Sequence, residues 1–206
     1  MPLTRHRRHG GASTISGGKA MANTQATGAP RGWNVWRTAG WSIPVLLLLL
    51  PAVAMQFSDD VVWTASDFVF AGLLFGSVGL AFEFIVRKSS SLAYRCGAGL
   101  AVLTAFLTVW ANGAVGMIGS EDNPFNLLFG GVLFIALIGA VLARLEPVGM
   151  VRAMVVTAIA QVAVGAAGLS TDVRGGIFSM AFGGLWLLSA ALFWNASREQ
   201  STADVV

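Results

Sequence analysis

Glu83 has the clearest chemical potential in this sequence, because it is a carboxylate inside an otherwise apolar stretch. It belongs to FEFIVRK (82–88), about one helical turn before the basic residues that end the stretch. A carboxylate in hydrocarbon is costly and needs a partner, and Arg87 lies four residues on, on the same helical face. We interpret the two as a structural ion pair near a membrane surface, with Arg95 or Arg144 as cross-helix alternatives. A proton or cation relay, or simple exposure of the carboxylate to water, are the other readings of Glu83.

Three apolar stretches carry small or polar residues at steps of three or four, which places them on one face of a helix. These residues are Gly72, Gly76, Gly79 and Glu83; Thr104, Thr108, Asn112 and Gly116; and Ala153, Thr157, Gln161 and Gly165. In lipid, such residues supply the close approach and hydrogen bonds that join helices. We therefore expect the three faces to point inward at one another as packing seams. The alternative is a polar path through the bundle, centred on Asn112 and Gln161.

A group of acids lies between the apolar stretches, in segments that hold few bases. Its members are Asp59, Asp60, Asp67, Glu121, Asp122 and Asp172. Carboxylate oxygens suit Ca²⁺ or Mg²⁺, but the spacing matches no known ion-binding loop, and we predict no metal site. Helix capping is the simpler role: Asp67 can cap one stretch, and Asp122 or Asn123 another, with Pro124 in its first turn.

The elements that position these residues must be membrane-spanning helices. The chain has 206 residues, of which 55% are hydrophobic and only 11% are charged, and its mean hydropathy is +0.71. Soluble domains carry about 25% charged residues. In a bilayer, helices satisfy their own backbone groups, so the sequence predicts an all-α fold, a polytopic transmembrane helical bundle of about six spans.

The predicted spans cover residues 39–57, 68–86, 96–118, 125–143, 153–169 and 175–196. They form one transmembrane domain, 39–197, and the first span should bend at its two prolines. Residues 1–38 are predicted to be a disordered basic tail with an aromatic anchor at the membrane interface, and 198–206 a short C-terminal tail. Two points stay open: translation could start at Met21, and the first span could be cleaved after Ala54.

The charged loops alternate in sign along the chain. Lysine and arginine mark the N-terminal tail and the second and fourth loops, whereas acids dominate the first and third. By the positive-inside rule, the basic segments are cytoplasmic. We predict a multi-pass protein of the bacterial inner membrane with both termini in the cytoplasm.

Motifs for soluble chemistry do not appear in the sequence. Both histidines lie in the N-terminal tail, and no phosphate-binding loop, dinucleotide fingerprint or zinc-protease motif occurs. The net charge of +3 reflects topology, because no basic, aromatic-laced domain exists to bind nucleic acid. We predict no catalytic residues, no cofactor and no nucleic-acid partner; the expected partners are the lipid bilayer and either other membrane proteins or further copies of the chain.

Four segments resemble a family of small multi-pass bacterial inner-membrane proteins without an assigned function. The segments are WTASDF (63–68), FEFIVRK (82–88), GSEDNP (119–124) and GMVRAMVVTAIAQ (149–161). The resemblance covers about residues 41–169. It implies a multi-pass fold and no particular biochemistry.

The sequence favours a non-enzymatic scaffold or accessory subunit of a membrane complex. Short loops, small-residue faces and scarce charge within the spans support this hypothesis. The alternative is a small secondary transporter or channel for a proton, cation or small solute, although the two halves of the chain show no matching motifs of the kind that inverted repeats leave. An enzyme ranks third, because the short loops leave little room for a substrate pocket.

Overall fold

A computed structural model describes residues 35–203, with side chains from Trp41 onward. This part of the chain is helical and contains no strand, which confirms the all-α fold. Its helices are α1 Val35–Ala54, α2 Ala65–Lys88, α3 Leu92–Ala114, the short 3-10 helix η1 Pro124–Asn126, α4 Leu127–Leu142, α5 Pro147–Gly168 and α6 Val173–Ala203. The expected disorder, aromatic anchor and alternative start at Met21 fall wholly or largely outside the described residues.

Five of these helices are long and apolar enough to cross a membrane, namely α2, η1 with α4, α3, α5 and α6. The chain is therefore a multi-pass membrane protein. The described side chains of α1 form a shorter apolar helix, Trp41–Ala54, so a sixth crossing and cleavage after Ala54 both stay predictions.

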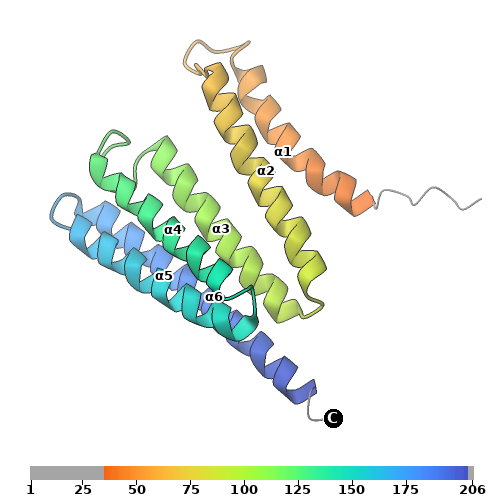
Figure 1. Cartoon of the computed structure of the whole chain (residues 1–206). Coiled ribbons are helices and arrows are strands. Elements are labelled where there is room, and N and C mark those ends of the chain that lie inside the picture. The colour runs from red at the N-terminus through yellow and green to blue at the C-terminus, as the bar shows by residue number, and fades with distance from the viewer. Residues whose placement is uncertain (1–34, 204–206) are drawn as a thin grey trace, which may run out of the picture.

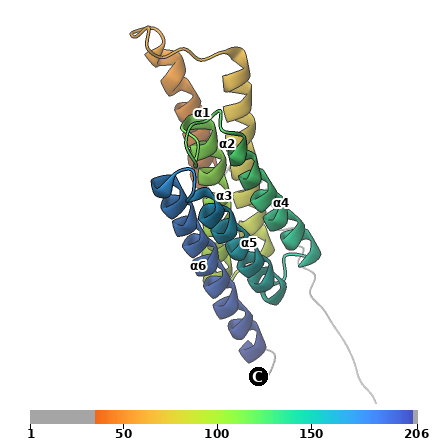
Figure 2. The same ribbon diagram turned by 90° about the vertical axis from the view of Figure 1, so that its left-hand side faces the viewer.

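The turns between helices gather at two ends of the molecule (Figures 1 and 2). One end, here called the acidic end, holds the α1–α2, α3–α4 and α5–α6 turns with Asp59, Asp60, Glu121, Asp122 and Asp172. The other, the basic end, holds the α2–α3 and α4–α5 turns with Arg87, Lys88, Arg95, Arg144 and Arg152. The split of charge expected from the loops is thus a property of the folded molecule, with Arg174 as a cation at the acidic end.

Helices α3, α6, α5 and α4 form a four-helix core in which α5 and α6 are the inner pair. Helix α6 packs mainly on α5 and α3, and α4 packs on α5. The α1–α2 hairpin is added to one side of this core through α3 (Figure 1). The expectation that the three small-residue faces meet is wrong, because the glycine face of α2 turns to α1. A Cβ on Gly79 would lie 3.0 Å from Trp41, and one on Gly72 would contact Leu48.

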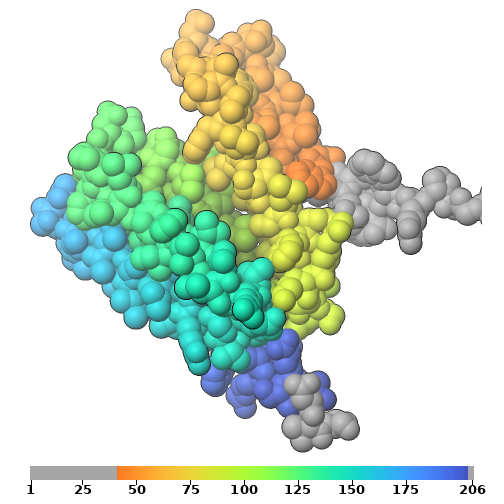
Figure 3. Space-filling model, in the orientation of Figure 1, coloured from red at the N-terminus to blue at the C-terminus, as the bar shows by residue number. Residues whose placement is uncertain are grey.

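Large aromatic side chains join α2 to α3. The Phe75 ring lies 5.7 Å from that of Phe106 and 5.9 Å from that of Trp110, and Phe82 lies against Gly99. Rings hold the two helices further apart than glycines would, and the space-filling view shows a hollow between α2 and the core at the acidic end (Figure 3). The core is therefore the tightly packed part of the fold, and the hairpin is a looser addition.

Helix boundaries differ from those expected by a few residues, and three of the differences bear on the candidate residues and tails. Helix α3 ends at Ala114 instead of at residue 118, so Gly116 lies in a turn. The prediction that Gly116 belongs to the small-residue face of α3 is therefore wrong. Helix α5 begins at Pro147, six residues early, because a proline suits a first helical turn. Helix α6 continues to Ala203, so most of the predicted C-terminal tail is helical; its 31 residues span roughly 46 Å, more than the hydrocarbon layer requires.

Candidate functional site

Buried polar side chains concentrate in the α3–α6–α5 core. Six of them are inaccessible to solvent: Thr104, Thr108, Thr157, Gln161, Ser179 and Ser189. The three threonines donate to backbone carbonyls four residues earlier on their own helices, at 2.8–2.9 Å. These hydroxyls are satisfied locally, so the threonines act as small packing residues on their helix faces.

Two further hydrogen bonds connect α6 to both of its main neighbours. The Gln161 side-chain NH₂ donates to the carbonyl and the hydroxyl of Ser179, both at 3.2 Å. On the other side, the Ser189 hydroxyl donates to the Gly97 carbonyl at 2.8 Å. Polar residues of α6 thus join α5 and α3 through the middle helix.

Three buried side-chain atoms lack a hydrogen-bond partner within the described part of the chain: Asn112 Oδ1, Gln161 Oε1 and Trp186 Nε1. Asn112 donates to the Thr108 carbonyl at 2.7 Å and makes no hydrogen bond to Gln161. The structure therefore does not join the two amides into a continuous polar path. It leaves two acceptors and one donor buried without a partner among the described residues.

The expected intrahelical pair of Glu83 is formed. Arg87 donates to Glu83 Oε1 from Nε at 2.8 Å and from Nη2 at 2.7 Å. The Glu83 side chain is 26% exposed and that of Arg87 66% exposed. Arg95, considered as an alternative partner, instead donates to the carbonyls of Ser89 and Val86.

Side chains also link the turns of the basic end. Lys88 forms an ion pair with Glu146 at 3.2 Å, which joins the α2–α3 and α4–α5 turns. The Tyr94 hydroxyl donates to the Leu145 carbonyl at 2.9 Å. The part of α6 beyond the predicted span, residues 197–203, is here called the extension of α6. The Ser91 hydroxyl donates to Glu199 on this extension at 2.7 Å. The extension of α6 is therefore docked against the turns of this end.

Capping explains Asp67 among the acids that the sequence singled out, with two corrections to the expected roles. Thr64 is the N-cap of α2, and Asp67 accepts from the Thr64 backbone N–H at 2.7 Å as the second half of a capping box. Asn123 caps η1 by accepting from the Phe125 N–H at 3.0 Å. Asp122 takes no part in that cap, and Glu121 and Asp122 are exposed.

The turn between α3 and α4, residues 115–126 and here called the plug, has a buried structure of its own that the sequence did not reveal. Met117 and Ile118 are buried, and the buried Asn126 side chain accepts from the Ile118 N–H at 2.9 Å and donates to the Ser120 carbonyl at 2.8 Å. Gly116 and Gly119 adopt positive φ values of 74° and 73°, which glycine tolerates best. The turn is therefore fixed in shape by one amide and two glycines.

Asp172 anchors this plug to the α5–α6 turn. Its carboxylate accepts from the Gly119 N–H at 3.1 Å and from the Arg174 N–H at 3.0 Å. The N–H groups of Gly175 and Gly119 hold the pKa of Asp172 below its usual value. Despite the acids at this end, no group of three His, Cys, Asp or Glu side chains lies close enough to hold a metal ion within residues 35–203.

Replacing Asp172 with asparagine should lower the thermal stability of the protein at neutral pH, because an amide nitrogen cannot accept from the backbone N–H groups. A carboxyl with a depressed folded-state pKa stabilises the fold above its unfolded pKa, and that contribution is lost as the pH falls through the folded-state pKa. The difference in Tm between wild type and Asp172→Asn in detergent should therefore be present at pH 7 and shrink below about pH 4.

The matched control is Asp122→Asn, since Asp122 is exposed and makes no hydrogen bond to another described residue. It should leave the Tm unchanged at both pH values. An equal effect of the two substitutions, or a difference for Asp172→Asn that does not depend on pH, would contradict the anchoring role.

Sequence reasoning missed the buried residues of α6 and the amide of Asn126. Gly176, Ser179, Gly183 and Trp186 follow one another at steps of three and four and are all buried, so the spacing used for the other helices would have found them. Asn126 carries no such signal, because it lies in a 3-10 turn. Comparison with known proteins finds no matching family model, no matching curated protein and no matching solved structure.

Proposed function

We propose that this protein is a non-enzymatic scaffold or accessory subunit that assembles with other membrane proteins or with further copies of itself. The observation that carries the proposal is a set of glycines that the chain does not use for its own packing. A Cβ placed on Gly76, Gly130, Gly131 or Gly184 would meet no other atom within 4 Å. In lipid, such positions allow the backbone of another helix to approach closely.

The contrast with the core glycines supports this reading. Gly139, Gly165, Gly176 and Gly183 all lie against neighbouring helices of the same chain. Gly130, in contrast, belongs to an exposed face of α4, with Phe134, Leu137 and Val141 at helical spacing and each more than 60% exposed. This α4 face combines a glycine with large apolar side chains, which suits a partner helix.

We further propose the bacterial inner membrane as the location, with the basic end in the cytoplasm. The acids and bases of the turns lie at opposite ends of the helices, and lysine and arginine favour the cytoplasmic side. Since α6 ends at the basic end (Figure 2), the C-terminus belongs on that side as well.

The test is affinity purification of the chain from membranes in mild detergent, for wild type and for Gly130→Leu. We expect a membrane polypeptide, or a second copy of the chain, in a fixed ratio to the wild type. Recovery should fall about tenfold for Gly130→Leu, since overpacking costs about 1–3 kcal/mol. The control is Ala163→Leu, at an exposed position of α5 outside the α4 face. A chain that purifies alone, or equal recovery with both variants, would contradict the proposal.

A small transporter or channel is the second candidate, favoured by the unpartnered interior atoms of Gln161, Trp186 and Asn112. A solute path through the core would bring hydrogen-bonding groups to those atoms. Flux into proteoliposomes that Gln161→Leu abolishes, in a variant that unfolds like the wild type, would replace the scaffold proposal with this one.

A further inference from the structure

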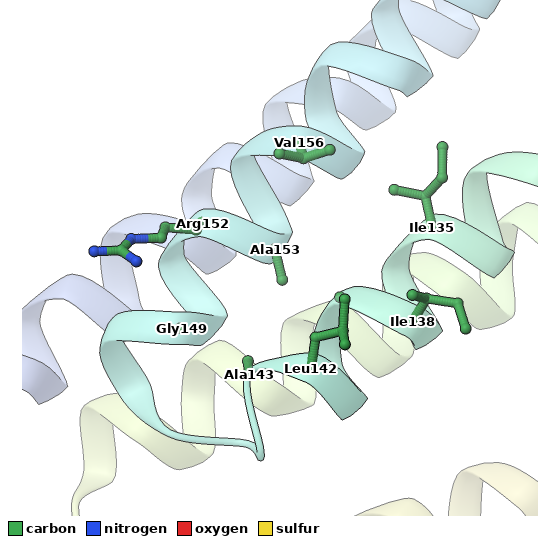
Figure 4. A pocket seen from close by; sticks show the side chains of 9 residues that line it. Ile135, Ile138, Leu142, Ala143, Gly149, Arg152, Ala153 and Val156 are labelled. Carbon is green, nitrogen blue, oxygen red and sulfur yellow. The ribbon is translucent and has the colours of Figure 1, made fainter.

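A groove runs between α4 and α5 near the basic end (Figure 4). Its volume is about 400 Å³, within the range of sites that hold small molecules, roughly 300–1,000 Å³. Ile135, Ile138 and Leu142 of α4 form one wall, and Val156 of α5 lies opposite them. The exposed fractions of these side chains run from 37% to 78%, so the groove opens to the surroundings of the helices.

Small residues at the crossing of the two helices create the groove. A Cβ on Gly139 would lie 2.8 Å from that of Ala153, and a Cβ on Gly149 would lie 2.7 Å from that of Ala143. The two backbones approach closely here, and the residues at the crossing are glycines and alanines. The shape therefore follows from the packing of α4 on α5.

Arg152 is the one charged side chain that borders this groove. In Figure 4 its guanidinium extends away from the apolar side chains, as expected of an arginine that reaches from hydrocarbon toward the headgroups. Arg152 is exposed and forms no ion pair with another described residue. The nearest acid in the sequence, Glu146, forms an ion pair with Lys88 and not with Arg152.

Arg152 lies close to the end of α5, where a membrane-spanning helix approaches the headgroup layer. It lies five residues after the start of α5 at Pro147, which is roughly 7.5 Å along the helix axis. The apolar walls continue from there toward the middle of the span. An open apolar groove with a single cation at its headgroup end is complementary to a lipid that carries a negative charge.

We propose that this groove binds an acyl chain of an anionic phospholipid whose headgroup phosphate pairs with Arg152. The lipid belongs to the leaflet that faces the basic end. The site is independent of the proposed scaffold role, because it uses the α4–α5 groove and not the exposed α4 face that contains Gly130.

The test is native mass spectrometry of the full chain in mild detergent, titrated separately with dioleoyl phosphatidylglycerol and dioleoyl phosphatidylcholine. Phosphatidylglycerol should bind about fivefold more tightly, the effect of one basic residue near an anionic lipid. Arg152→Gln should abolish this preference, whereas Arg198→Gln, an exposed arginine on the extension of α6, should leave it unchanged. Val156→Trp, which fills the groove from its wall, should weaken the binding of both lipids.

Three results would overturn the proposal. They are equal affinity for the two lipids, a preference that survives Arg152→Gln, and displacement of the lipid by millimolar inorganic phosphate, which would make the site one for a free anion. A polypeptide that occupies the groove and excludes phosphatidylglycerol would likewise assign this surface to a protein partner. Each variant is first shown to unfold like the wild type.

Discussion

Replacing Gly116 with alanine is expected to destabilise the protein by roughly 2–5 kcal/mol. Gly116 has a φ of 74°, where a Cβ costs about 1–2 kcal/mol. The new atom would also lie 2.5 Å from the carbonyl carbon and oxygen of Ser120, and 2.8 Å from Asn126 Nδ2. Because the first two are backbone atoms of the same tight turn, they cannot move aside without changing the plug.

The damage should spread through the hydrogen bonds of the turn. Moving Ser120 away from Gly116 breaks the bond that Asn126 donates to its carbonyl. The same amide holds the Ile118 N–H, and Ile118 is fully buried against Gly168 at the end of α5. A single methyl group at the acidic end should therefore loosen the contact between the α3–α4 turn and α5.

The measurement is the free energy of unfolding in mixed micelles, from titration with a denaturing detergent. Gly131→Ala is the matched control, since its Cβ meets nothing within 4 Å and alanine favours a helix by up to about 1 kcal/mol. The control should be neutral or slightly stabilising. If Gly116→Ala were equally well tolerated, the plug would not have the backbone that the structure shows.

The sequence was sufficient to predict the helices and the ends at which charges gather. Hydropathy indicates whether a stretch of sequence lies in water or in hydrocarbon. In a bilayer, only structures whose backbone N–H and C=O groups bond to one another are stable. The pairing of Glu83 with Arg87 was equally accessible, because it depends on a spacing of four residues on one helix. These features are local, so one stretch of sequence contains all the information they need.

The neighbours of each helix could not be predicted in this way. A face of small residues indicates that another helix packs closely against it, but it does not indicate which helix. In lipid, the hydrophobic effect does not favour one apolar face over another as a partner. Gly72 and Gly79 of α2 were expected to face the interior and instead face Leu48 and Trp41 of α1. No small-residue face was predicted for α6, although its residues pack on both α3 and α5.

The α3–α4 plug shows a different limit. Met117 and Ile118 are apolar, so hydropathy extended the third span over them, although both lie beyond the end of α3 at Ala114. They are buried by α5, α6 and Asn126 instead of by lipid. Hydropathy does not distinguish burial in protein from exposure to hydrocarbon, so a buried turn at the edge of a span is read as part of the span.

Gly165→Leu should separate α5 from α6, with an expected loss of about 2–4 kcal/mol. A Cβ on Gly165 would lie 2.8 Å from Met180 Cγ and 3.0 Å from both the Gly176 carbonyl oxygen and the Met180 nitrogen. A Cβ on Gly176 would in turn lie 2.8 Å from the Gly165 oxygen. The two backbones therefore touch at this crossing, and a leucine there can be accepted only if the helices move apart.

Separation at this point should also break the hydrogen bonds one turn deeper, where Gln161 donates to Ser179. Unfolding of the variant in mixed micelles measures the loss, and Gly184→Leu is the matched control on the open side of α6. Adding Met180→Ala to Gly165→Leu should restore only part of the stability, because truncating that side chain removes one obstacle and leaves the two backbone atoms in place. Full recovery in the double variant would show that the side chain alone sets the limit, and equal stability of the Gly165 and Gly184 variants would mean that α5 and α6 do not cross in backbone contact.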